Sequence, residues 1–355
     1  MPPHNTYHLA RAVGAALLLT PIILLAAAVA PRIEVVAHEA ARRVDVTIDG
    51  KPFTSYIWPV QVKKPVLYPL RSAKGTLVTR GWPLDPRPGE RVDHPHHVGM
   101  WLNYESVNGK DFWNNSDAIK PADAPKMGTI LHRSIISTKS GADRGELVAE
   151  ADWVLHDGKT ILRERTQYVF AGGATTRSID RMTTLTALEE RVVFADAKDG
   201  MLGIRVARQL EQPSTKPEVF TDIAGRATAV PALDNTGVSG SYLTSEGKSG
   251  DAAWGTRGRW TMLSGTIGDE PIAIAILDHP KNPGFPTYWH ARGYGLFAAN
   301  PLGQKAFSNG KETLNFTLEP GASATFRYRV LILSGTVKPD AIEREYQAFA
   351  PMSSQ

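Results

Sequence analysis

The sequence contains no cysteine among its 355 residues. This absence excludes disulfides, thiolate zinc sites, iron–sulfur clusters and cysteine nucleophiles together. The sequence also lacks long runs of lysine and arginine, and its net charge is only +4, so nucleic acid is not an expected partner. Any reaction must therefore use histidine, carboxylates, lysine, tyrosine, arginine, or a metal bound by oxygen and nitrogen.

Several common catalytic motifs are absent as well. The sequence has no G-x-S-x-G elbow, no G-x-x-x-x-G-K-[ST] phosphate loop, no H-E-x-x-H, and no G-x-G-x-x-G between a strand and a helix. These absences argue against serine hydrolases, nucleotide hydrolases, zincins and nicotinamide enzymes. Catalysis by histidine and carboxylate side chains is the chemistry that these exclusions leave open.

One long apolar run stands near the N-terminus. Residues 12–30, AVGAALLLTPIILLAAAVA, are uncharged and follow Arg11, which is typical of a signal peptide or a single membrane anchor. Residues 1–30 are therefore predicted to be one or the other, with cleavage left open because Pro31 follows directly. Residues 31–355 are predicted to form a single domain in the periplasm or outside the cell, touching the inner membrane only through an uncleaved segment 12–30.

The rest of the sequence is dominated by strand and hairpin patterns. Alternating residues flank Asp49-Gly50, and longer ones flank Asp157-Gly158, so both turns are predicted to close hairpins. A third hairpin is predicted around Pro320-Gly321. Ile272–Leu277 is short and wholly apolar, as expected of a strand buried on both faces, and residues 340–349 are predicted to be helical. Many strands without alternating helices predict an all-β protein, a large antiparallel β-sandwich with a short C-terminal helix.

Titratable and aromatic residues are concentrated in residues 93–115, DHPHHVGMWLNYESVNGKDFWNN, which hold three of the ten histidines. Imidazole changes charge near neutral pH and binds metals, so this cluster favours a chemical role. If residues 94–102 are extended, His94 and His96 share a face and His97 points the other way.

A second dense stretch follows the apolar strand, at residues 278–301, DHPKNPGFPTYWHARGYGLFAANP. It repeats the Asp-His-Pro sequence of residues 93–95, and proline after each histidine favours an extended strand end. We expect the two stretches to meet in one pocket, with Lys198 and Asp199 brought to the same mouth.

Four stretches in order carry a resemblance to a known family: residues 93–113, the hairpin WVLHDGKTILRER, DAKDGMLGIRVA, and residues 278–303. Together they resemble the bacterial family catalogued as methane oxygenase PmoA-like, in essence a domain of unknown function. The family name implies a membrane copper monooxygenase, whereas this sequence has at most one apolar segment. The likeness extends to galactose mutarotase-like supersandwiches, which implies sugar chemistry by histidine and a carboxylate.

A carbohydrate ligand also suits the residues themselves. Sugar rings present C–H faces to aromatic planes and hydroxyls to polar side chains. The sequence therefore predicts an exported carbohydrate-active protein that performs acid–base chemistry on a sugar or a sugar-derived carbonyl compound, as an epimerase, lyase or hydrolase, without a cofactor. The predicted substrate-binding residues are Trp113, Tyr288, Trp289, Arg292 and Lys198. The predicted catalytic residues are His94, His97, His279, His290 and Asp111.

Within the catalytic set, His97 and His290 are the first candidates for proton transfer. His94 and His279 are alternates, positioned by Asp93 and Asp278. Each residue also has a structural reading: the histidines can satisfy loop carbonyls, and Asp111 can be a turn residue beside Asn108-Gly109.

Two other functions stay open. His94 and His96 with His290 could supply three imidazoles to one divalent metal in an oxygenase-like enzyme. A non-catalytic sugar-binding protein is the other alternative, although pure binding needs no group with a pKa near 7.

Overall fold

Two large antiparallel β-sheets form the body of the protein. The computed structural model describes residues 1–4, 6, 30–232 and 234–352. The predicted signal or anchor, residues 1–30, therefore lies outside the described residues apart from residues 1–4, 6 and 30. Residues Pro31–Gln355 make one compact unit. Within the described residues, no helix is long and apolar enough to cross a membrane.

Within the part of the chain that the structure describes, the first sheet has nine strands in the order β18-β19-β12-β5-β4-β3-β2-β1-β7. Their bounds are β1 (Arg32–His38), β2 (Arg43–Ile48), β3 (Lys51–Ile57), β4 (Val66–Leu67), β5 (Met100–Tyr104), β7 (Gly141–Ala142), β12 (Gly200–Arg205), β18 (Tyr288–Ala291) and β19 (Leu296–Asn300).

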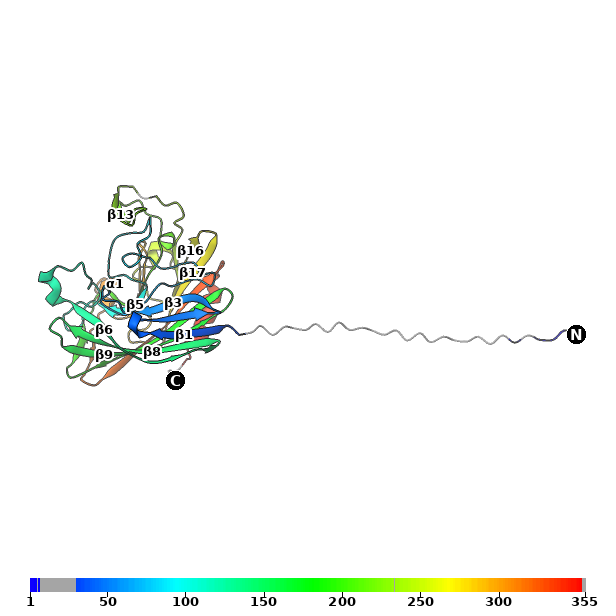
Figure 1. The fold of residues 1–355 in the computed structure, drawn as a ribbon, viewed down its shortest axis with the longest axis horizontal. Coiled ribbons are helices and arrows are strands. Elements are labelled where there is room, and N and C mark those ends of the chain that lie inside the picture. The colour runs from blue at the N-terminus through cyan, green and yellow to red at the C-terminus, as the bar shows by residue number, and fades with distance from the viewer. Residues whose placement is uncertain (5, 7–29, 233, 353–355) are drawn as a thin grey trace. The chain divides into compact units, whose positions relative to one another are not determined.

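The second sheet has eight strands over the same described residues, in the order β15-β16-β17-β21-β10-β9-β8-β6. Their bounds are β6 (Gly128–Lys139), β8 (Arg144–Leu155), β9 (Thr160–Gly172), β10 (Thr176–Ala187), β15 (Ser241–Thr244), β16 (Trp260–Ile267), β17 (Glu270–Asp278) and β21 (Ser323–Ser334). The two sheets face each other, with β1 against β6 and β8, and β2 against β9 (Figure 1).

Smaller elements complete the fold. Two short strand pairs join β11 (Val192–Phe194) to β20 (Phe316–Leu318) and β13 (Glu218–Thr221) to β14 (Ala227–Val230). The helices are α1 (Gln304–Phe307), α2 (Pro339–Phe349) and the 3-10 turns η1 (Glu39–Ala41), η2 (Pro121–Lys126), η3 (Arg208–Leu210) and η4 (Gly250–Ala253). The prediction of a large antiparallel sandwich with a short C-terminal helix is confirmed.

Most of the local predictions hold. Asp49 and Gly50 have φ of 52° and 72°, which a tight turn needs, and they join β2 to β3. The turn at Asp157-Gly158 joins β8 to β9, and β17 lies between β16 and β21. The hairpin expected around Pro320-Gly321 is wrong, because β20 pairs with β11 while β21 pairs with β10 and β17. Turn chemistry alone could not show which strands would pair across the sandwich.

At the end of the first sheet that contains β5, β12, β18 and β19, other parts of the protein cover both faces of the sheet. The candidate site lies on one of these covered faces. All residues of β5, β12, β18 and β19 are buried. One face, which includes Leu102 and Phe297, packs into the main core between the sheets. The other, which includes Trp101 and Ala298, packs under loops from residues 58–99 and 105–127 as a second cluster. Side chains alternate between the faces, so neighbours in sequence belong to different layers.

Candidate functional site

The three histidines of the first dense stretch form one aromatic cluster. They do not lie on an extended strand, since β5 begins only at Met100 and the His97 amide donates to the His94 carbonyl at 2.9 Å to close a turn. The His94 ring stacks on His97 at 4.8 Å and meets His96 at 5.7 Å. The expectation that His97 points away from His94 is therefore wrong, because a turn brings the rings together.

His94 has an unusual backbone. Its φ is +45°, in the left-handed region that residues other than glycine rarely occupy. Two donors hold its carbonyl in place: the His97 amide and the Arg80 guanidinium at 3.0 Å. Strained residues are often found at functional sites, where the surrounding structure keeps them in place.

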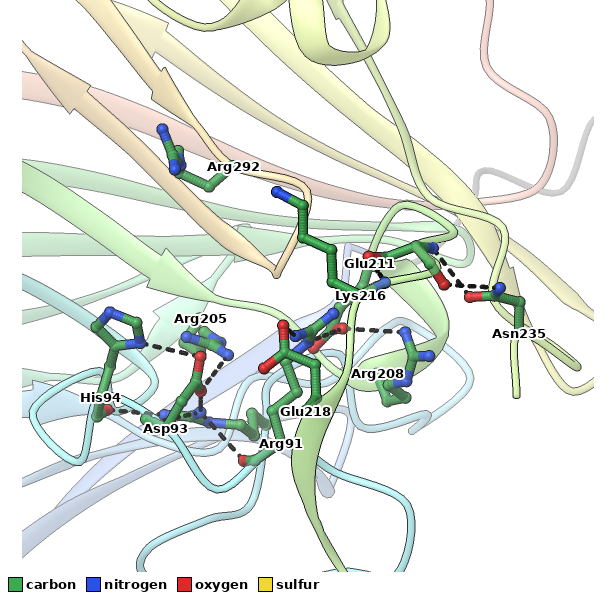
Figure 2. Close-up of polar contacts among 12 residues, drawn as sticks. Arg91, Asp93, His94, Arg205, Arg208, Glu211, Lys216, Glu218, Asn235 and Arg292 are labelled. Atoms are coloured by element: carbon green, nitrogen blue, oxygen red, sulfur yellow. Dashed lines mark hydrogen bonds and ion pairs between the residues drawn. The ribbon is translucent and has the colours of Figure 1, made fainter. Parts of the chain in front are cut away.

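Asp93 anchors the cluster through a network of charged hydrogen bonds, drawn in Figure 2. One carboxylate oxygen accepts from Arg80 at 2.5 Å and from Arg205 at 2.6 Å, and the other accepts from His94 Nδ1 at 2.9 Å. Burial by itself raises the pKa of Asp93, but the hydrogen bond from His94 and the charges of Arg205 and Arg80 together hold it well below its ordinary value. Asp93 is therefore ionised at neutral pH.

Arg80 and Arg205 were not expected from the sequence, yet both guanidinium groups are fully buried beneath this turn. Arg205 Nη1 also lies 3.3 Å from His97 Nδ1. Because a guanidinium only donates, Nδ1 must accept, so His97 is neutral and its proton is on Nε2. For Arg205, the signal in the sequence that could have indicated a buried charge was a lone arginine within the apolar run LGIRVA.

Burial separates the three histidines by role. His96 and His97 are 8% and 1% exposed, whereas the His94 side chain is 40% exposed. Burial, then the charge of Lys64, lowers the pKa of His96 to about 2. Burial, then His96 and Arg205, lowers the pKa of His97 well below its usual range. Only His94 is accessible to a ligand among the three.

His290 lies on the outer face of the same sheet. Trp101, Gly203, Ala298 and His290 are register partners across β5, β12, β19 and β18, so they form one row. His290 Nδ1 is 3.4 Å from the Asp199 carboxylate. Burial, then the charges of Arg292 and Lys198, lowers the pKa of His290 to about 3. His290 is thus a neutral buried residue rather than an accessible acid.

Two acids, Asp199 and Glu105, lie together near His290. Burial raises the pKa of Asp199, and the charge of Lys198, whose Nζ is 3.6 Å away, opposes that shift. Glu105 accepts a hydrogen bond from the Asp199 amide at 3.2 Å, and burial followed by the Asp199 charge raises the pKa of Glu105. Lys198 is half exposed, so it lies at the rim of this set.

The structure does not bring every predicted residue to the cluster. His279 packs edge-on against Phe349 of α2 and its Nε2 contacts the Met352 carbonyl, because it directly follows Asp278, the last residue of β17 in the second sheet. Trp289 faces the main core, since it alternates with His290 along β18. Both residues are structural in this arrangement.

Three further predicted residues are packed or act in turns. Trp113 is 1% exposed and lies against Trp101 and His97. Tyr288 stacks on Phe307 at 5.5 Å. Asp111 accepts from the Trp113 and Asn114 amides, both at 2.9 Å, which is the turn role allowed for it from the sequence. Among the described residues, no group of three His, Cys, Asp or Glu side chains is arranged to hold a metal, so His94, His96 and His290 do not form such a group.

The second dense stretch reaches the cluster through Tyr294. Its ring stacks on His94 at 5.0 Å, with the two planes 1° apart, and Arg205 lies over the same ring at 5.0 Å. Tyr294 also lines a cavity of about 400 Å³, together with Arg292, Trp254, Gln212 and Asp251 among others. This volume is that of a small-ligand pocket.

Lys64 is a third residue, after Arg80 and Arg205, that sequence patterns did not single out. It is 2% exposed, its Nζ donates to the His96 carbonyl at 2.7 Å, and it lies 5.3 Å from the Trp101 ring centroid. Burial lowers its pKa to about 7, against the opposing charge of Asp111. Its contact with a backbone carbonyl indicates that it supports the histidine turn.

Comparisons with solved structures find similar folds at low identity. The galactosidase domain of an alpha-galactosidase–sucrose kinase matches at 9% identity and a TM-score of 0.38, covering 85% of this chain and 42% of that chain. A family GH36 alpha-galactosidase from Geobacillus stearothermophilus matches at 11% and 0.37, covering 85% and 41%. This chain therefore spans about two fifths of either protein. Similarity at this level does not identify a ligand or a reaction.

A galactose mutarotase-like protein from Clostridium acetobutylicum matches over 86% of this chain and 99% of its own length, at 10% identity and a TM-score of 0.35. No curated protein sequence matches.

The family comparison finds a family of unknown function. Residues 43–347 match the family described as "Family of unknown function (DUF6807)". Neither this match nor the solved structures support the resemblance to the methane oxygenase PmoA-like family. Because the match spans most of its length, this chain belongs to the family of unknown function DUF6807.

Proposed function

We propose that this protein performs acid–base chemistry on a sugar or a sugar-derived carbonyl compound, with His94 as the proton-transfer group. One observation carries the proposal: His94 is accessible, is bonded to the ionised Asp93, and stacks on an aromatic residue that lines a small cavity. General acid–base catalysis at neutral pH most often uses an imidazole that is positioned and accessible to the substrate.

The contact with Asp93 also determines which nitrogen of His94 reacts. An ionised carboxylate only accepts, so Nδ1 carries the proton toward Asp93. In neutral His94 the other ring nitrogen is then free to take a proton, and Figure 2 shows it on the side of the ring away from Asp93. His94 can therefore abstract a proton from a hydroxyl, or from a carbon beside a carbonyl, and return it.

The cavity beside Tyr294 suits a carbohydrate. Tyr294 and Trp254 supply aromatic surface, while Gln212 and Asp251 supply amide and carboxylate groups for hydroxyls. The ring of Tyr294 is common to the cavity and the His94 stack, so it links a sugar bound there to the proposed base.

This assignment replaces His97 and His290 as the first candidates for proton transfer. Both are almost completely buried, and both have a pKa lowered by burial, so they are poor proton donors at neutral pH. His97 supports His94 by stacking on it, whereas His290 lies next to Asp199. We also propose export to the periplasm or beyond, which rests on residues 12–30 alone.

A screen by nuclear magnetic resonance in D₂O tests the proposal. The purified protein is incubated with common hexoses, their oxidised keto and aldonate forms, and small glycosides, and the spectra report anomer exchange, loss of a carbon-bound proton, or cleavage. We expect at least one compound to change with the wild-type protein and to remain unchanged with His94→Gln. If no sugar reacts, or if His94→Gln reacts at the wild-type rate, the assignment is wrong.

A further inference from the structure

The cavity beside the His94 stack has a cation that the protein itself does not neutralise. The Arg292 side chain is exposed, and its guanidinium carbon lies 5.8 Å from the Trp254 ring centroid and 5.7 Å from that of Tyr294. No acidic partner reaches it among the described residues, and Figure 2 draws no interaction from its guanidinium. Stacking on aromatic planes orients a guanidinium and leaves its N–H edge free to bind.

Lys216 is a second cation that lines the same cavity and has no acidic partner among the described residues. Its backbone amide donates to Ser214, but its ammonium has no ion pair within the described part of the chain. Arg91, which also lines the cavity, differs in this respect. It is 2% exposed and forms ion pairs with both Glu211 and Glu218, so its charge is satisfied within the protein.

The carboxylates on the cavity wall do not compensate Arg292 and Lys216. Glu218 is bound to Arg91, and the remaining acid, Asp251, accepts from the Gln212 side chain at 2.6 Å. Asp251 is exposed and retains an oxygen that can accept from a hydroxyl. The wall thus presents two uncompensated cations, one carboxylate and one amide, a set that fits a ligand with an anionic group as well as hydroxyls.

We infer that the ligand of this cavity is an anionic sugar, whose carboxylate, phosphate or sulfate group binds Arg292 with the help of Lys216. The inference rests on the proposed function, because it names the substrate class of the same site. A guanidinium binds such groups through two parallel N–H donors, and an ammonium adds charge without fixed direction.

Tyr294 connects this anion site to the proposed chemistry. One and the same ring contacts Arg292 and stacks on His94. An anionic group held by Arg292 therefore anchors one end of a sugar while the rest of the ring extends over Tyr294 toward His94. Binding energy at the anionic end would then position the carbon or hydroxyl that reacts.

Isothermal titration calorimetry with three related probes tests the inference: d-glucuronate, d-glucose 6-phosphate and d-glucose. We expect at least one of the two anionic probes to bind about tenfold or more tightly than glucose, in keeping with one charge-assisted contact. Raising the salt concentration should weaken binding of that probe and leave glucose unaffected. Comparing the two anions distinguishes a carboxylate site from a phosphate site.

Arg292→Gln and Lys216→Gln should each reduce the preference for the anion severalfold, and the double variant should abolish it. Arg144→Gln and Lys311→Gln are matched controls, since both side chains are exposed and neither lines the cavity. The inference is overturned if neither anion binds, if glucose binds equally well, or if Arg292→Gln keeps the preference.

The same variants separate this inference from the proposed function. If anions bind through Arg292 but no sugar is converted, or His94→Gln is fully active, the proposed chemistry fails and the anion site stands. If a neutral sugar is converted in a His94-dependent manner while Arg292→Gln changes neither its KM nor the binding of anions, the anion site fails and the chemistry stands.

Discussion

His94 and Tyr294 stack face to face, with ring centroids 5.0 Å apart, although they come from the two separate dense stretches of the sequence. Through this contact the Asp93–His94 pair is joined to a residue that lines the cavity. It is the physical basis for assigning the proton transfer to His94, and it suggests several measurements.

Replacing His94 by glutamine should lower kcat/KM by roughly 10²-fold or more on any sugar substrate, because removal of a general base costs about that much. The side chain is 40% exposed, so the melting temperature should change by only a few degrees. His156→Gln is the control, since His156 is exposed on the turn between β8 and β9. Equal losses in both variants would argue against a catalytic role for His94.

Replacing Asp93 by asparagine should destabilise the protein by about 3 kcal/mol, because two buried guanidinium groups lose their shared carboxylate. Urea unfolding followed by tryptophan fluorescence measures the change. Asp123→Asn, which removes an exposed pair with Lys126, should change the free energy of unfolding far less, because solvent screens exposed ion pairs. Similar values for the two variants would mean that the Asp93 network contributes little to stability.

Gly203→Ala should destabilise the protein by roughly 1–3 kcal/mol through overpacking. A Cβ at Gly203 would lie 2.6 Å from the Trp101 ring, which is fully buried and stacked on His97, so the ring has little freedom to move. Gly173→Ala is a matched control, because a Cβ there meets no atom within 4 Å. Equal unfolding midpoints would show that the Trp101 layer can relax.

Stability should fall as the pH is lowered from about 6.5 toward about 3, and His290 should contribute to that fall. Burial lowers its folded pKa to about 3, whereas the unfolded side chain titrates near 6.5. Over this interval the unfolded state binds more protons, so its free energy drops relative to the folded state. Thermal melts of His290→Gln should therefore show a weaker loss between these pH values, while His156→Gln keeps the wild-type slope. A slope unchanged by His290→Gln would contradict the neutral buried state of His290.

Treatment with a strong chelator should leave activity on a sugar substrate intact, since Asp93, held by the two buried arginines, orients the His94 ring without a metal. Inductively coupled plasma mass spectrometry of the protein before and after treatment gives the metal content. A stoichiometric metal whose removal abolishes activity, and whose return restores it, would favour the metal-dependent alternative.

The local features of the fold were largely accessible from the sequence. Strand alternation, the Asp-Gly turns and the apolar run Ile272–Leu277 depend on side-chain period and on φ preferences, which act over a few residues. The prediction of the third hairpin was wrong because it rested on the same local turn signal that correctly predicted the other two. A turn at Pro320-Gly321 specifies a change of direction, but which strand pairs with β21 depends on packing across the sandwich.

The candidate site was only partly accessible. The density of histidine and aromatic residues correctly drew attention to residues 93–115 and to the stretch that contains Tyr294. Roles within those stretches depend on burial and direction, which composition does not carry. His97 and His290 look as reactive as His94 in the sequence, yet the structure buries both of them.

By itself, the sequence determined the chemistry that is open to this protein, the antiparallel architecture and the two stretches where polar groups concentrate, because residue identity and short periodicities set these. The tertiary structure alone decided that Arg80 and Arg205 converge on Asp93 and that Tyr294 meets His94. It also moved His279 away to α2 and turned Trp289 into the core. These outcomes depend on which strands become neighbours and which face of each strand is covered, and both are set by long-range packing that no local pattern encodes.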